Sequence, residues 1–428
     1  MAGALWPALL EPAAHGMDEL CAVSAEGVRV RFLDGRELLC GTSGLWNANL
    51  GYGNKAIALA SSAALHDASY LSVFRFENTY ARQAAENLIQ AAGAGNFGRV
   101  VFSTSGGAAN DLVMKLARHY QALRGYGTRK LVVGLRDSYH GLTFGGFALT
   151  GENLGQSVYA VDQRLVRHVR PNEAEEIRRL TERQGQQIAA VVVEPVLGTG
   201  AVPLTPAYVR TLLELRARHG FLLVADEVAT GFGRTGSFFA SQLWPAPPDL
   251  LITSKGLTNG TSAAAAVLVS QPVAAAFDAA GEVFFHGETQ AGTPVTCAAI
   301  LATLAEMRRL DAVASAQRLS ARLDEALADL VATHPRVIGT TGAGCFRSIR
   351  LCTPTGELLP QHEVPRVVAA IRRAGAIVHP SVQGVQILPA LTYTADELAE
   401  LLDCVRAGLD APAGVGSGAV GTMQAGAL

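Results

Sequence analysis

The feature that most constrains the fold is a repeated alternation, between about Asn96 and Ser270, of short apolar runs with segments of helical periodicity. These runs are continuously apolar, as in strands that are buried on both faces of a sheet. The segment 206–220 places Pro206 near its start and Gly220 just past its end, which is typical of a helix. Strands that alternate with helices predict a parallel, doubly wound α/β sheet. The runs are RVVFSTS, KLVVGL, IAAVVVEPV, FLLVAD and DLLITS.

The pattern changes after Thr296, where long helical segments are interrupted by VIGTTGAGCFRSIRL and GVQILPALTYT. This change predicts a second, smaller α+β domain. We therefore expect an N-terminal segment that packs with the small domain (1–48), a large domain (49–305), a C-terminal small domain (306–410) and a tail (411–428). The tail is rich in glycine and lacks charge, so we expect it to be mobile.

Composition excludes several classes of protein. The 428 residues are 49% hydrophobic and 17% charged, with a net charge of −2, which gives no electrostatic argument for nucleic acid or a membrane surface. Six scattered cysteines without a C-x-x-C pair argue against a disulfide framework and a structural zinc site, and we predict no metal. The N-terminus lacks a basic region before its apolar part, and no apolar stretch is long enough to span a bilayer. We expect a cytoplasmic protein.

The stretch FLLVADEVATGFGRTG contains GFGRTG, which matches the dinucleotide-binding pattern G-x-G-x-x-G. That fingerprint requires glycines at the turn from strand to helix and an acidic residue about 20 positions later. Here Glu227 to Thr230 separate the strand end from Gly231, and the first acid after the glycines is Asp249. We therefore interpret GFGRTG as a tight surface loop and not as a nicotinamide site.

Two ionisable residues end neighbouring apolar runs. Asp226 ends FLLVAD, and Lys255 ends DLLITSK. Ligands of open α/β sheets bind beyond the carboxyl ends of the strands, so both side chains are expected to face one crevice. A carboxylate and an amine can form a simple ion pair. They are also what pyridoxal phosphate requires, since lysine forms its Schiff base and an acid keeps the pyridine nitrogen protonated.

The other requirements of this cofactor also have candidates. Ser105, Gly106 and Gly107 open a helix whose first amides can bind a phosphate. Tyr139 follows a strand and could stack on the pyridine ring, and Thr289 offers a hydroxyl group to the phosphate. Taken singly, Tyr139 could be a core residue, the neighbouring His140 a loop histidine and Thr289 a helix cap. Their joint occurrence in this order favours a pyridoxal phosphate site.

With these motifs, the chain resembles the class III (ω-) aminotransferases of pyridoxal phosphate fold type I. The resemblance extends from GLWNANLGYGN to GVQILPALTYTADEL and is most specific in DEVATGFGRTG followed by DLLITSKG. It implies that Lys255 forms the Schiff base and shuttles the proton, while Asp226 pairs with the pyridine nitrogen. It also implies that Val228 packs on the ring face opposite Tyr139.

The same resemblance assigns the remaining cofactor contacts. Ser105, Gly106 and Gly107 would hold the phosphate, joined by Thr289 from the partner subunit of a homodimer with shared active sites. His140 and Glu194 would lie near the cofactor. We expect ping-pong transfer of an amino group from a small amine or amino acid to a ketone or aldehyde. Decarboxylases and aminomutases share this fold, and a non-catalytic scaffold protein is a further alternative.

The chain also departs from the family pattern. Gly107 and Ala108 replace a serine and a glutamate of the usual S-G-S-E-A-N, and Ala229 replaces the glutamine of D-E-V-Q-T-G. Gln386 aligns with an arginine that commonly binds the substrate α-carboxylate, so we expect one half-reaction to use a substrate without that group. Trp46 resembles a pocket aromatic of the amine:pyruvate branch. A softer resemblance is to aminotransferases of the daptide type, which aminate a ketone at a peptide C-terminus in natural product biosynthesis.

Overall fold

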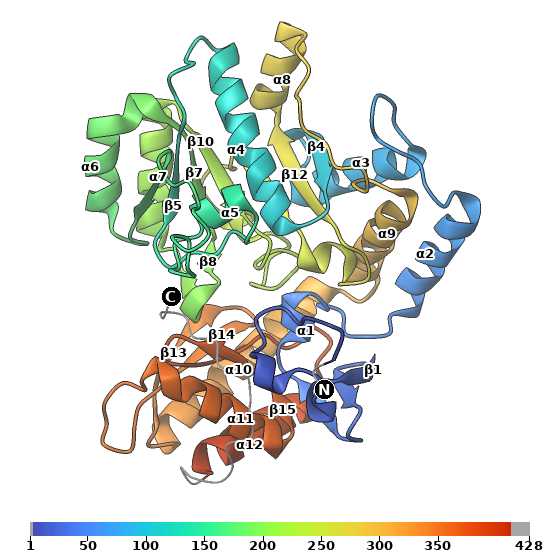
Figure 1. The fold of residues 1–428 in the computed structure, drawn as a ribbon, viewed down its shortest axis with the longest axis vertical. Coiled ribbons are helices and arrows are strands. Elements are labelled where there is room, and N and C mark those ends of the chain that lie inside the picture. Colours follow the sequence, from blue (N-terminus) through green and yellow to red (C-terminus); the bar gives the residue numbers. More distant parts are fainter. Residues whose placement is uncertain (1–2, 412–428) are drawn as a thin grey trace.

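The computed structural model describes residues 3–411 and is built around a seven-stranded sheet (Figure 1). The strand order is β4-β12-β11-β10-β7-β5-β6. Five of these strands contain the apolar runs that the sequence singles out. The bounds are β4 Phe97–Ser103, β5 Leu131–Leu135, β6 Val166–Val169, β7 Ile188–Val193, β10 Leu222–Asp226, β11 Leu250–Thr253 and β12 Ala265–Ser270.

The sheet is mainly parallel, as predicted, but not entirely so. β12 pairs antiparallel with both of its neighbours, β11 and β4, while the pairs on the other side of β11 are parallel. β12 lies in the most apolar stretch of the sequence, and every residue in it is buried. Apolar runs without polar alternation indicate burial but carry no information on strand direction, so periodicity could not reveal the reversal.

Helices cover both faces of this sheet and make it doubly wound (Figure 1). One buried cluster joins the sheet to α4 (Gly106–Leu123), α5 (Phe144–Leu149) and α8 (Gln271–Ala280). A second cluster joins the opposite face to α6 (Ala174–Gln184) and α7 (Pro206–His219). In α7 the Thr205 side chain accepts a hydrogen bond from the Tyr208 amide, and Gly220 ends the helix at a φ of 75°, as the sequence predicts.

The second half of the structure packs below the large sheet in Figure 1 and contains both ends of the described chain. A small sheet joins β1 (Ala22–Glu26), β2 (Arg29–Phe32) and β3 (Glu37–Cys40) to β15 (Ala376–Ile377) from the C-terminal part. A second sheet has the order β13-β14-β17-β16. Its strands are β13 Val337–Ala343, β14 Phe346–Leu351, β16 His379–Ser381 and β17 Gly384–Ile387.

Long helices connect the two halves. One large core cluster runs from α3 and the edge of the seven-stranded sheet through α9 and α10 into the C-terminal strands. The bounds are α2 Lys55–Asp67, α3 Thr79–Gly93, α9 Pro294–Arg309, α10 Ala312–Thr333, α11 Val364–Ala374 and α12 Ala395–Asp410. The predicted domain boundaries stay predictions, since this core is continuous across them.

The structure bears only partly on the predicted tail and on the predicted cytoplasmic location. Of the predicted tail 411–428, all but the first residue lies outside the described residues. Within residues 3–411, no helix is long and apolar enough to cross a membrane. The cytoplasmic location and the lack of a nucleic-acid partner stay predictions.

Candidate active site

The predicted site residues meet at the carboxyl ends of the strands, around a cavity of about 650 Å³. Each motif ends a strand or lies in the loop after one: Ser105 lies after β4, Tyr139 after β5 and Glu194 after β7, and Asp226 ends β10. Lys255 follows β11 after one residue, at the start of a short 3₁₀ turn and not on the strand itself. Of the twelve residues that the sequence singles out, all but Thr289 and Gln386 line the cavity.

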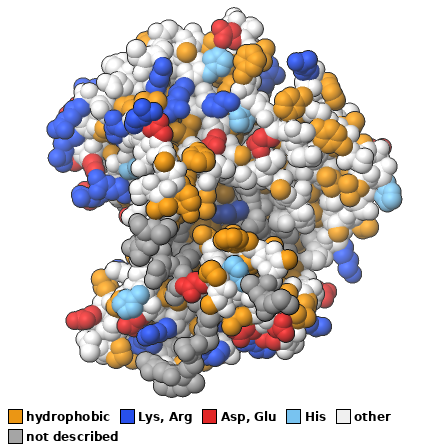
Figure 2. All heavy atoms as spheres, in the orientation of Figure 1, with side chains coloured by type: hydrophobic (Ala, Val, Ile, Leu, Met, Phe, Trp, Pro, Cys, Tyr) orange, Lys and Arg blue, Asp and Glu red, His pale blue; other side chains and the backbone are white. Residues whose placement is uncertain are grey.

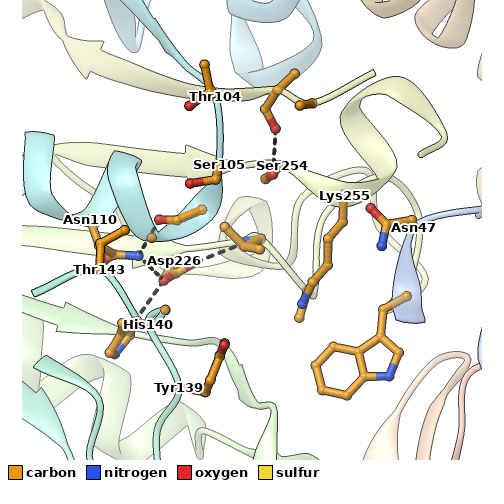
Figure 3. A pocket seen from close by; sticks show the side chains of 18 of the residues that line it. Asn47, Thr104, Ser105, Asn110, Tyr139, His140, Thr143, Asp226, Ser254 and Lys255 are labelled. Carbon is orange, nitrogen blue, oxygen red and sulfur yellow. Dashed lines mark hydrogen bonds and ion pairs between the residues drawn. The ribbon is translucent and has the colours of Figure 1, made fainter. Parts of the chain in front are cut away.

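Asp226 is buried and accepts hydrogen bonds on both of its carboxylate oxygens (Figure 3). Its Oδ2 accepts from Asn110 Nδ2 at 2.9 Å and lies 2.8 Å from His140 Nδ1, while Oδ1 accepts from the Val228 amide at 3.1 Å. Burial alone would lower the pKa of His140, but the contact with Asp226 holds it above its ordinary value. Asp226 is therefore held in place by Asn110 and the Val228 amide, with the His140 imidazole in contact with it.

Lys255 extends into the cavity between Asp226 and Asn47 (Figure 3). Its ammonium group lies 4.3 Å from the centre of the Trp46 ring, a cation–π distance. Burial lowers the pKa of Lys255 from 10.5 to about 8, although the charges of Glu194 and Asp226 favour the protonated form. A lysine with this pKa supplies far more neutral, nucleophilic amine at neutral pH than an ordinary surface lysine does.

Glu194 forms the wall between Tyr139 and the loop that follows β7. Its Oε2 accepts a hydrogen bond from the Tyr139 amide and its Oε1 accepts one from the Gly198 amide, each at 3.0 Å. Burial raises the pKa of Glu194 to about 7, and the nearby Asp226 charge adds to this shift. Glu194 can therefore hold a proton in this site near neutral pH.

The start of α4 forms a cradle with little side-chain volume. The Ser105 side chain caps the helix by accepting a hydrogen bond from the Ala108 amide. A Cβ atom on Gly106 would lie 3.1 Å from a Val228 methyl group, and one on Gly107 would lie 3.2 Å from Thr143 Oγ1. Only glycine leaves this space free beside the first amides of a helix, where a phosphate binds favourably.

Three polar residues at this cradle were not predicted from the sequence. Asn110 contacts Asp226, and Thr104 lines the cavity. The Glu288 carboxylate accepts hydrogen bonds from the Thr104 amide at 3.1 Å and from the hydroxyl groups of Ser103 and Thr104. The helical position of Asn110, one turn after the glycines, was the available signal for that residue. Glu288 lies far away in sequence and could be found only in three dimensions.

The two remaining candidates lie elsewhere. Thr289 is exposed outside the cavity of its own chain, and its carbonyl oxygen accepts a hydrogen bond from the Tyr70 hydroxyl at 2.9 Å. Gln386 is buried on β17, and its Nε2 donates to the Gly198 carbonyl at 2.7 Å. The Gln386 side-chain amide is therefore already hydrogen-bonded to the main chain. The substrate-contact role expected from its alignment stays a prediction.

The interpretation of GFGRTG as a surface loop is wrong. Gly231 to Arg234 are buried, and Arg234 donates to the Pro389 carbonyl at 2.6 Å and to Asn49 Oδ1 at 2.5 Å. The turn is tight, with φ values of 56° at Phe232 and 83° at Gly233. Its glycines allow the chain to bend sharply inside the protein, so that Arg234 ties the large sheet to the N- and C-terminal segments. None of these glycines lines the cavity described above.

The residues present fit pyridoxal phosphate. The cavity combines a glycine cradle at a helix start, a buried carboxylate and a lysine of depressed pKa. Two buried polar atoms beside Asp226, Asn110 Oδ1 and His140 Nε2, have no partner among the described residues. Such atoms indicate a polar group that completes the site. Ser105–Gly107 would hold the phosphate, Val228 and Tyr139 would enclose the ring, and Asp226 would face its nitrogen.

Comparison with known proteins supports this assignment. The class-III aminotransferase family model matches residues 12–409. The chain is 31% identical over 407 residues to the omega-aminotransferase of Caulobacter vibrioides, covering 90% of this chain and 92% of that protein.

Solved structures agree. A thermostable (S)-enantioselective omega-transaminase from Thermomicrobium roseum superposes with a TM-score of 0.85 at 28% identity, over 91% of this chain and 92% of that one. An amine transaminase from an uncultivated Pseudomonas species, solved with pyridoxal phosphate bound, gives a TM-score of 0.89 at 29% identity, over 96% and 99%. These matches confirm the predicted fold type I architecture. The chain belongs to the class III aminotransferases and is an enzyme that depends on pyridoxal 5'-phosphate.

Proposed function

We propose that this aminotransferase uses, in at least one half-reaction, a substrate without an α-carboxylate. The observation that carries the proposal is the composition of the cavity wall. Among the described residues that line it, Lys255 is the only lysine and none is an arginine. Gln386, at the position expected for the carboxylate-binding arginine, is already bonded to the Gly198 carbonyl. A carboxylate would therefore find no fixed cation beyond the reacting amine itself.

The wall beside Lys255 is aromatic. Trp46 packs against Phe346 and His379, with ring centres 5.2 and 5.3 Å apart. Burial, with a smaller effect from Lys255, lowers the pKa of His379 to about 4, so its imidazole is neutral at physiological pH. A neutral aromatic wall suits an apolar or uncharged substituent next to the reacting carbon. A ketone at a modified peptide C-terminus is one acceptor of this kind.

The protein groups have separate tasks in amino transfer. Pyridoxal phosphate supplies an electrophilic carbonyl group and an electron sink when it is bound. Lys255 Nζ takes a proton from the donor carbon and returns it on the acceptor side, since it extends into the cavity and burial lowers its pKa to about 8. Asp226, held by Asn110 and His140, would present its carboxylate to the ring nitrogen of the bound cofactor. Decarboxylase, aminomutase and scaffold roles are not favoured, because the matched proteins are aminotransferases.

The experiment compares acceptors. Protein loaded with the amino form of the cofactor is mixed with pyruvate, 2-oxoglutarate, an aryl methyl ketone and a peptide that ends in a methyl ketone. The recovery of visible absorption gives each rate. We expect the ketones or the peptide to react faster than 2-oxoglutarate at equal concentration. The donor half-reaction is compared in the same way, by the bleaching of the absorption with amino acids and with amines that lack a carboxylate. Faster reaction with both keto acids than with every uncharged acceptor, together with faster bleaching by amino acids than by every such amine, would contradict the proposal.

We also propose a homodimer in which Thr289 of one chain serves the cofactor phosphate of the partner. Support comes from the exposed position of Thr289 and from the apolar surface beside it. In the segment 70–76, Tyr70, Leu71, Phe74 and Phe76 are exposed, and this segment contacts residues 287–292. Hydrophobic side chains are also numerous over α2 and α3 in Figure 2. Exposed apolar surface of this kind is typical of a protein interface.

Complementation tests this dimer. Thr289→Ala and Lys255→Ala proteins, each of low activity alone, are unfolded together and refolded. A mixed dimer contains one site with both residues intact, so activity should reappear on mixing. Sedimentation as a monomer, or no recovery in dimers shown to be mixed, would contradict the shared site.

A further inference from the structure

The short segment α1, Ser43–Trp46, is wound in the left-handed sense. Its four residues have φ values of 48°, 55°, 58° and 70°. Three of them are not glycine, and consecutive L-residues rarely adopt this conformation because Cβ approaches the following carbonyl oxygen. Such strain persists only where the surroundings hold it, and it clusters at functional sites. We therefore expect that neighbouring residues hold this turn in place and that it serves the active site.

The cause is a link to the strand that carries Gln386. The buried Ser43 hydroxyl donates to the Leu388 carbonyl at 2.6 Å, and the Leu388 amide donates to the Gly41 carbonyl at 2.6 Å. Within the turn, the Trp46 amide donates to the Thr42 carbonyl at 2.7 Å. The hydrogen bond from the Ser43 side chain to Leu388 thus attaches the turn to the C-terminal part of the protein.

The result of the turn is the position of Trp46. Its indole ring lies over the Lys255 ammonium group at 4.3 Å and against Phe346 and His379. A right-handed path through the same four residues would direct the side chain elsewhere. The strained turn therefore determines which surface faces the reacting amine.

The far edge of the indole ring packs on Gly198. A Cβ atom there would lie 3.4 Å from the Cη2 and Cζ3 atoms of Trp46 and 3.2 Å from Glu194 Oε1. The Gly198 carbonyl accepts the Gln386 bond, and its amide donates to Glu194 at 3.0 Å. Gln386 thus holds the main-chain surface on which Trp46 rests.

We propose that Ser43 is a positioning residue of the active site: its bond to Leu388 locks the left-handed turn and holds Trp46 over Lys255 before substrate binds, while Gln386 supports the same ring through Gly198. Trp46 then bounds the space beside the reacting amine as a rigid wall. The consequence for substrate selection rests on the proposed function, but the position and rigidity of Trp46 do not.

The test measures Trp46 in the cofactor-free protein. Trp6→Phe and Trp244→Phe leave Trp46 as the single tryptophan, since the chain has three. Acrylamide quenching of its fluorescence then reports how firmly the ring is packed. Ser43→Ala should raise the quenching constant about twofold or more, because loss of one neutral hydrogen bond corresponds to about a fivefold change in the population of the turn.

Leu45 provides matched variants at an exposed site. Its side chain is 59% exposed and its φ is 58°, so Leu45→Gly should relieve strain and leave quenching unchanged. In the Ser43→Ala background, Leu45→Gly should restore part of the packing, which general destabilisation would not do. If Ser43→Ala does not fold, Leu45→Val adds strain without touching the bonds and should also raise quenching.

The outcomes separate this inference from the proposed function. Unchanged quenching in both Ser43→Ala and Leu45→Val would overturn the role of the turn, whatever the substrates are. Increased quenching with rescue by Leu45→Gly would support it even if the acceptor proved to be a keto acid.

Discussion

Raising the pH from 6 to 10 should reveal Lys255 as an abnormally acidic amine. Its pKa is lowered from 10.5 to about 8 because its charge is buried. At pH 7 an amine with a pKa of 8 is neutral in about a tenth of the molecules, roughly 300 times more than one with a pKa of 10.5. The shift corresponds to about 3 kcal/mol of differential interaction between the two protonation states.

The sign of the effect follows from the reacting species. The neutral amine is the nucleophile, so the rate at which Lys255 reacts with added pyridoxal phosphate should rise about tenfold per pH unit below pH 8. Above pH 8 most of the amine is neutral and the rate should level off. Stopped-flow absorbance of the cofactor-free protein measures this rate. A model lysine peptide, measured in parallel, corrects for the titration of the free cofactor.

Two results would refute this reasoning. A corrected rate that keeps rising through pH 10 would show that Lys255 titrates as an ordinary lysine. A pH profile unchanged in Lys255→Ala would show that another of the four lysines reacts. In either case, burial at the foot of the cavity would not activate the amine.

Four substitutions give further tests. Lys255→Ala should abolish turnover while the glycine cradle still retains the cofactor, as measured by activity and by cofactor absorbance after gel filtration; retained activity would contradict the assignment. Asp226→Asn should lower kcat/KM by about 10²–10³-fold, because it removes the charge that faces the ring, and a near-normal value would argue against that role. Gly106→Ala should weaken cofactor binding, since its Cβ would crowd Val228 at 3.1 Å; equilibrium titration measures the affinity, and an unchanged affinity would contradict this prediction. Arg234→Leu should lower the free energy of unfolding in urea by about 2–4 kcal/mol, since two buried acceptors lose their donor; an unchanged midpoint would contradict its structural role.

The sequence predicts the architecture because local patterns reflect burial. Apolar runs without alternation became the strands of the large sheet, and the carboxyl-end rule correctly brought Asp226 and Lys255 to one cavity. Strand direction was not encoded locally, so the reversal of β12 was missed. Its direction depends on pairing with β4, which lies more than 150 residues away.

Side-chain partners were harder to predict than positions. GFGRTG is rich in glycine and contains arginine, and both features suggest a surface. The burial of Arg234 depends on Asn49 and Pro389, which come from opposite ends of the chain. The sequence pattern singled out Gln386 as a departure, but its contact with Gly198 is visible only in three dimensions. Left-handed winding at Ser43–Trp46 has no sequence signal beyond Gly44.

The measurement that tests the central claim most directly is the visible absorption spectrum of the purified protein during addition of amines and carbonyl acceptors. The account predicts a coloured protein whose absorption is bleached by an amine donor and restored by a ketone, aldehyde or keto acid, as two separate half-reactions. A protein that stays colourless with added pyridoxal phosphate, or whose absorption responds to no amine of a broad panel, would contradict it.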